Sequence, residues 1–114
     1  MSQFGWVFVF VLLLISSVNE KRWIQTQLAE EVKSGLLSAQ QVVIASSPRK
    51  RNMAFLNAPA GKRAATRRFY TACVEIAFKK QQRLKMGEEG HHNTAIITNY
   101  RNEIRGYILK GLFS

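Results

Sequence analysis

The apolar positions beyond residue 22 recur every three to four residues, a spacing typical of helices that bury one face. The first such helix is predicted over residues 19–34, with Glu31 among the polar residues assigned to its other faces. Gly35 is placed to end it in a Schellman motif, with Leu36 or Leu37 supplying the hydrophobic contact. The apolar positions of this helix are Trp23, Ile24, Leu28 and Val32.

A second, short helix is predicted to begin at Ser38, because Ser38 and Gln41 have the spacing of a capping box. It ends before Pro48, since the residue preceding a proline avoids the helical region. The basic run at residues 49–51 and a brief amphipathic piece follow. The sequence Asn-Ala-Pro-Ala-Gly at residues 57–61 predicts a break.

Two longer helices follow, over residues 62–86 and 94–110, joined by a polar connection in which Asn93 or Thr94 is the expected N-cap. A short polar connection between two helices predicts an antiparallel hairpin. The apolar stripe of the first of these helices comprises Phe69, Ala72, Cys73, Ile76 and Ala77, with Tyr70 and Phe78 beside it. No alternating strand pattern of useful length occurs, so an all-α fold is expected.

The chain opens on an uncharged apolar run at residues 4–18. As a helix this run covers about 22 Å, so spanning a hydrocarbon core of about 30 Å needs its flanks as well. We interpret it as a membrane helix, because the basic residues follow the run, whereas a cleaved signal peptide has them in front. A signal peptide and a buried core helix remain the alternatives. The expected membrane anchors are Trp6, Lys21, Arg22 and Trp23.

The expected architecture is therefore one N-terminal membrane helix followed by a small cytosolic helical bundle with a C-terminal antiparallel helical hairpin. Residues 1–22 are assigned to the membrane helix and its flank, and residues 23–61 to juxtamembrane helices and a basic linker. Residues 62–114 form the hairpin. Positive charge after the leader places the C-terminal part in the cytosol, which predicts a single-pass membrane protein.

The charge of the chain bears on its partners, because 17 basic residues against 7 acidic ones give a net charge of +10. A solvated face combined with a topology signal explains such an excess most simply; anionic lipid is the second interpretation, and a protein partner the third. Nucleic acid is not expected, since no base-reading module is recognisable. The candidate lipid- or partner-binding residues are Arg49, Lys50, Arg51, Arg67, Arg68, Lys79, Lys80 and Arg83. Of these, Lys80 and Arg83 fall in line with the apolar stripe, so we expect the helix end to project them into solvent or toward phosphate.

Catalytic chemistry is not expected from this chain, nor is a metal, a cofactor or a small-molecule substrate. It lacks a metalloprotease motif, a glycine-rich phosphate loop and a nucleophile elbow, and it contains no Asp for a Ser-His-Asp triad. His91 and His92 are adjacent in an expected loop rather than spaced to share one helix face, so we interpret them as solvated. The single Cys73 is expected to be a small buried core residue.

Three motifs together resemble the cytosolic C-terminal region of PrsW-type intramembrane metalloproteases. They are Leu28-x-x-Glu-Val-x-x-Gly35-x-Leu-Ser38, Arg67-Arg68-Phe-x-x-Ala72-x-x-Glu-Ile-Ala-Phe-Lys-Lys80 and Ile97-x-x-Tyr-Arg-x-Glu-Ile104. The resemblance covers residues 23–107. In that family a membrane-embedded Glu-Glu-x-x-Lys motif and histidines on other membrane helices are thought to form the metal site. Here Glu30-Glu31-Val32-Lys33 is one residue short and lies outside the apolar run, so no catalytic residue is carried over.

The resemblance implies a non-catalytic, membrane-tethered interaction or regulatory segment, either from a truncated gene or as a separate subunit that has kept only the tail. An independent basic membrane adaptor that binds anionic lipid or a partner helix is the alternative. A secreted basic peptide, released from a signal sequence, is the third interpretation.

Overall fold

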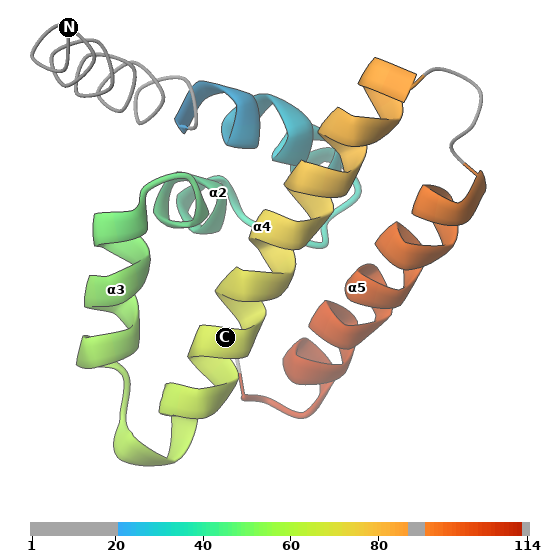
Figure 1. Ribbon diagram of the computed structural model, residues 1–114. Coiled ribbons are helices and arrows are strands. Elements are labelled where there is room, and N and C mark those ends of the chain that lie inside the picture. The colour runs from blue at the N-terminus through green and yellow to red at the C-terminus, as the bar shows by residue number, and fades with distance from the viewer. Residues whose placement is uncertain (1–20, 87–90, 113–114) are drawn as a thin grey trace, which may run out of the picture.

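The computed structural model describes residues 21–86 and 91–112, and all regular secondary structure in these ranges is helical. This confirms the all-α fold. The helix over residues 21–33 is followed along the chain by α2 (Ala39–Ala45), α3 (Pro48–Asn57), a 3-10 turn η1 (Ala60–Lys62), α4 (Arg63–Met86) and α5 (His91–Leu109) (Figure 1).

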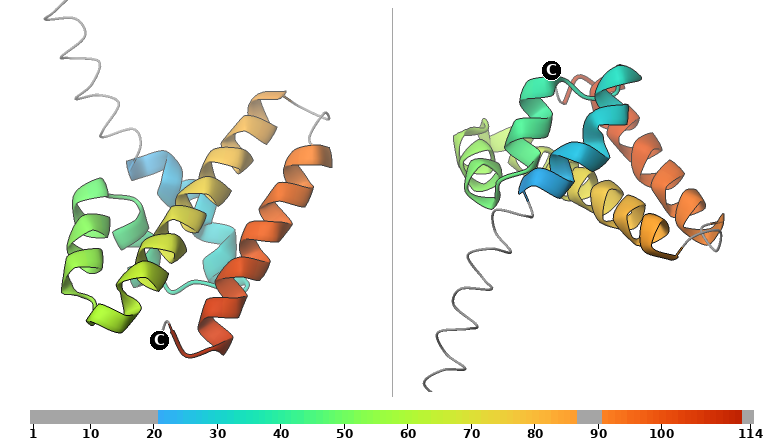
Figure 2. Two further views of the ribbon diagram at one scale, coloured as in Figure 1. Left: turned by 60° about the horizontal axis from the view of Figure 1, so that its bottom comes forward. Right: turned by 90° about the horizontal axis from the view of Figure 1, so that it is seen from above.

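The predicted C-terminal hairpin is confirmed. Helices α4 and α5 run antiparallel and lie side by side in both further views (Figure 2). Helix α4 also contacts α2 and α3, so it is the central element of the bundle. The 21–33 helix crosses the C-terminal half of α4, while α3 lies beside the N-terminal half.

Two helix ends, at Gly35 and at Ser38, are set by the local signals that the sequence predicted. Gly35 has a φ of 80°. The amide of Leu36 donates to the carbonyl of Glu31 at 2.9 Å, and the amide of Gly35 donates to the carbonyl of Val32 at 3.1 Å. These are the two hydrogen bonds of a Schellman motif. The capping box at Ser38 is likewise present, with both reciprocal hydrogen bonds formed.

The core is a single apolar cluster in which α3 has no fully buried residue, although its Ala54 packs partly buried against the cluster. All five residues of the predicted α4 stripe are buried, including Cys73, whose thiol pKa is raised by burial. Phe78, which the sequence places beside the stripe, is 44% exposed. Trp23 packs partly buried against the core, as its place on the apolar face of the first helix predicts, while Lys21 and Arg22 are exposed. The role of these three residues as membrane anchors stays a prediction.

Two sequence-based boundaries are wrong. The basic triplet at residues 49–51, expected in a linker, lies in the first turn of α3, because Pro48 takes the N1 position and the Ser47 side chain accepts from the backbone amide of Lys50. Helix α5 begins at His91 rather than after Asn93. His91 and His92 are therefore helical and not in a loop; the expected solvation of their side chains lies outside what the structure describes.

The described helices include none that is both long and apolar enough to cross a membrane. The predicted membrane helix over residues 4–18, together with Trp6, lies outside the described residues.

Candidate functional site

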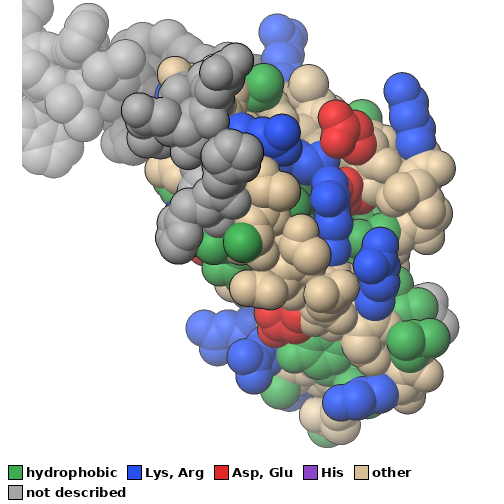
Figure 3. Space-filling model, turned by 90° about the vertical axis from the view of Figure 1, so that its right-hand side faces the viewer, with side chains coloured by type: hydrophobic (Ala, Val, Ile, Leu, Met, Phe, Trp, Pro, Cys, Tyr) green, Lys and Arg blue, Asp and Glu red, His purple; other side chains and the backbone are tan. Residues whose placement is uncertain are grey.

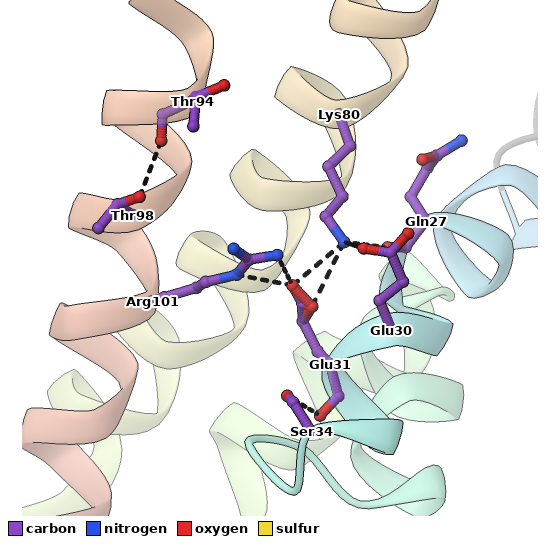
Figure 4. Close-up of polar contacts among 8 residues, drawn as sticks. All are labelled: Gln27, Glu30, Glu31, Ser34, Lys80, Thr94, Thr98 and Arg101. Atoms are coloured by element: carbon purple, nitrogen blue, oxygen red, sulfur yellow. Dashed lines mark hydrogen bonds and ion pairs between the residues drawn. The ribbon is translucent and has the colours of Figure 1, made fainter. Parts of the chain in front are cut away.

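A buried cluster of charges joins three helices around Glu31, whose side chain is 1% exposed (Figure 4). Lys80 reaches it from α4, with its Nζ 3.1 Å from Oε1 of Glu31. Arg101 reaches it from α5, and both its Nε, at 2.8 Å, and its Nη2 donate to the same oxygen. One carboxylate thus ties the 21–33 helix to both arms of the hairpin.

Lys80 is only 8% exposed, and its ammonium has a partner for each of its donors. Besides Glu31, it donates to the backbone carbonyl of Gln27 at 3.1 Å and to Oε2 of Glu30 at 3.0 Å. This hydrogen bond from Lys80 is the main reason why the pKa of the Glu30 carboxyl lies below its usual range. The contribution of Glu30 to stability is thus present at neutral pH and lost as the pH falls through that lowered pKa.

The sequence-based expectation for Lys80 is wrong, because the residue is buried rather than projected into solvent. The 21–33 helix covers α4 at this point and supplies the acceptors. Glu31, which was assigned to a polar face, is buried as well. The sequence does contain an indication that both residues are buried. Lys80 continues the apolar stripe of Phe69 and Ile76, and Glu31 lies on the same helix face as Leu28. Arg83 is exposed, as expected.

The cluster is a structural tie between the 21–33 helix, α4 and α5. The residues that the structure describes contain no group of three or more His, Cys, Asp or Glu side chains placed to hold a metal ion. Among them, no buried side-chain nitrogen or oxygen lacks a hydrogen-bond partner. The charges of the cluster are therefore paired with one another, which leaves the exposed basic residues as candidates for a binding surface.

A cleft of about 370 Å³ opens between α3 and α4 and brings two of the predicted basic residues together. Arg51 is half-buried there, and its Nη1 donates to the backbone carbonyl of Ala45 at the end of α2. The guanidinium of Arg67 lies over the ring of Phe55, 5.9 Å from its centroid. The cleft is lined by Arg51, Asn52, Phe55, Arg67, Tyr70 and Thr71.

The outward face of α3 lies next to this cleft and combines basic and apolar side chains. Met53 and Leu56 are 52% and 55% exposed, and α3 buries no side chain of its own. At about 100° per residue, Leu56, Arg49 and Met53 lie within about 60° of one another, in the middle of the exposed face. Lys50 lies at the edge of the same face and is exposed. We call Arg49, Lys50, Met53 and Leu56 the α3 face.

The other candidate basic residues are spread over α4. Arg68 lies 3.8 Å from a carboxylate oxygen of Glu103, and the ammonium of Lys79 lies 5.7 Å from the ring centroid of Phe78. On the face of the molecule shown in Figure 3, basic side chains are scattered among acidic and apolar ones. By contrast, no acidic residue occurs in the sequence between Glu31 and Glu75, so the charged residues of α3 and of the first half of α4 are all basic, while α2 carries no charge.

Comparisons with known proteins assign no family to the chain: no family model matches it, and no similar curated protein and no similar solved structure is found.

Proposed function

We propose that this chain is a non-catalytic, membrane-associated interaction module whose α3 face binds an anionic lipid surface. The observation that carries the proposal is α3 itself, a helix that buries no side chain and yet presents Met53 and Leu56 beside Arg49 and Lys50. Apolar side chains flanked by basic ones suit a helix lying at the boundary between headgroups and acyl chains.

Charge supports the same surface. Each basic residue close to an anionic membrane contributes about 1 kcal/mol of attraction. The absence of acidic residues between Glu31 and Glu75 removes local repulsion from this side of the molecule. The 21–33 helix, which follows the predicted leader, contacts the junction before α3, where Gln25 donates to the Ser46 hydroxyl at 3.4 Å. A chain anchored by its leader would thus hold α3 near the membrane.

The proposal places the leader across the membrane and the described helices on the cytosolic side. A reporter domain fused after Ser114 is then expected to behave as cytosolic, since Lys21 and Arg22 follow the uncharged run. Protease protection in sealed vesicles measures this, with a fusion before Met1 as the control. A mature N-terminus at Val18 or beyond would contradict it. The resemblance to the tail of PrsW-type proteins stays a prediction.

A fluorophore on the α3 face tests the lipid contact in the full chain. Met53→Cys can be labelled selectively, because the only native thiol, that of Cys73, is buried and has a raised pKa. In vesicles containing phosphatidylserine, we expect a blue-shifted emission that lipid-borne quenchers reduce. At 1 M salt, where the Debye length falls to about 3 Å, both effects should weaken.

Reversing Arg49 and Lys50 to Glu should weaken the contact about tenfold or more, since the attraction of two basic residues is lost. Helix α3 should persist, because acidic side chains suit its first turn. Reversing Arg105 and Lys110, exposed residues of the α5 end, is the matched control with the same change in charge. The proposed lipid surface would be refuted if neutral phosphatidylcholine vesicles quenched the fluorophore as strongly as phosphatidylserine vesicles do. It would also be refuted if the α5 reversal weakened binding as much as the reversal of Arg49 and Lys50.

A further inference from the structure

We propose that the cleft between α3 and α4 binds a phosphate monoester, and that its two arginines hold the phosphate. The source of that phosphate, on the function proposed above, is the headgroup of an anionic phospholipid. Asn52 lines the cleft and is itself exposed, so the cleft opens next to the α3 face. A membrane in contact with the α3 face would therefore bring headgroups to the mouth of the cleft.

Both arginines make a contact within the protein at the cleft. The Nη1 of Arg51 donates to the backbone carbonyl of Ala45, while Arg67, which is exposed, lies over the ring of Phe55. A guanidinium stays charged at physiological pH and can hydrogen-bond a phosphate. Two such groups match a phosphate monoester, whose charge near neutral pH is about −1.5 to −2.

The remaining lining residues add no negative charge. Burial raises the pKa of Tyr70 to about 12, so its phenol is neutral at physiological pH. The hydroxyl of Thr71 donates to the backbone carbonyl of Arg67 at 2.8 Å, and the side chain of Asn52 supplies amide donors. At about 370 Å³ the cleft falls within the size range of small-molecule sites.

A neighbouring depression between α4 and α5 shows why the phosphate belongs on the α3 side. It is also lined by Arg67, together with Arg68, but Glu75 and Glu103 line it as well, which balances the charge. An anion approaching Arg67 from that side meets two carboxylates, whereas from the α3 side it meets Arg51. Arg67 lines both hollows, and only on the side of the depression do carboxylates oppose its charge.

Titration of the full chain in a non-ionic detergent with inorganic phosphate tests the chemistry without a membrane. Arginine side-chain resonances in NMR spectra should shift saturably, and sodium chloride at equal ionic strength should not reproduce the shifts. Arg67→Gln should lower the affinity for phosphate about tenfold to a hundredfold. Arg68→Gln, the neighbouring exposed arginine, is the matched control and should leave it within about twofold.

A second variant, Asn52→Asp, leaves both arginines intact and adds a carboxylate at the mouth of the cleft. It should lower the affinity about tenfold without changing the helical circular-dichroism signal, because the residue is exposed. Linear shifts with no saturation, or equal affinity in the Arg67→Gln variant, would overturn the phosphate site.

Vesicles distinguish the two sources of phosphate. At equal surface charge, the labelled Met53→Cys chain should bind phosphatidic acid, which carries a monoester, more tightly than phosphatidylserine, and Arg67→Gln should remove the difference. If phosphate binds saturably but no vesicle engages the α3 face, the cleft takes a soluble phosphate monoester and the proposed lipid function fails. If vesicles engage the α3 face but phosphate does not bind, only the cleft is refuted.

Discussion

Replacing Glu31 by Gln is expected to lower the free energy of unfolding by about 3–5 kcal/mol. The carboxylate is 1% exposed, and it is the acidic partner shared by Lys80 and Arg101. A neutral amide at this position leaves the buried ammonium of Lys80 with the exposed Glu30 as its remaining carboxylate partner. A thermal melt of the full chain in detergent, followed by circular dichroism, should show a loss of about 10 °C or more.

Glu30→Gln is the matched control, because it makes the same chemical change one residue away. The Glu30 side chain is 77% exposed and contacts the same ammonium at 3.0 Å. An exposed ion pair contributes about 1 kcal/mol or less, so the melting temperature should fall by only a few degrees. Equal losses in the two variants would show that burial of Glu31 does not decide the stability of the cluster.

Tertiary contacts, and not local signals, bury this cluster, which explains why the sequence analysis missed it. Lys80 is 49 residues from Glu31, and Arg101 is 70 residues from it. Spacing along one helix shows that Lys80 continues an apolar stripe, but it does not show which other helix crosses there. We interpreted the end of the stripe as the end of the core. Where the 21–33 helix crosses α4, the buried region continues beyond the apolar stripe through the polar contacts of Lys80.

The helix ends were predictable because each depends on a few adjacent residues. Gly35, with its left-handed backbone, and Ser38, with its reciprocal cap, encode their turns within a short stretch of sequence. The α4 stripe was predictable for a similar reason, since a period near 3.6 leaves one face apolar. Pro48 and the start of α5 are the exceptions. Pro48 ends one helix, as predicted, but it also begins the next, and α5 begins at His91 rather than after Asn93.

The candidate basic surface was predictable in composition but not in arrangement. The sequence names eight basic residues, three in an expected linker and five on one helix. The structure brings Arg51 and Arg67 to one cleft, while it buries Lys80. Which residues meet depends on the rotation of α3 about its own axis. That rotation turns Phe55 toward α4 and leaves Met53 exposed. The apolar residues of α3 do not indicate it, because Met53 and Leu56 are exposed whereas Phe55 is half-buried.

Replacing Phe69 by Ala is expected to cost about 3–5 kcal/mol of unfolding free energy, comparable to the loss of Glu31. Phe69 is fully buried on α4, the helix that contacts most of the others. Its ring packs edge-on against that of Tyr70, with 5.2 Å between the centroids. Truncation removes this pair and leaves a cavity that the close-packed helices fill only in part. Chemical denaturation of the full chain in detergent measures the loss.

Phe78→Ala is the matched control, since it deletes the same side chain from the same helix. Phe78 is 44% exposed, and its described ring contact is with the ammonium of Lys79, at 5.7 Å from the centroid. Losing that contact should cost about 1 kcal/mol. The two phenylalanines lie nine residues apart on α4, at about 180° from each other around the helix axis. A bundle that loses equal stability in the two variants would place the core on a different side of α4.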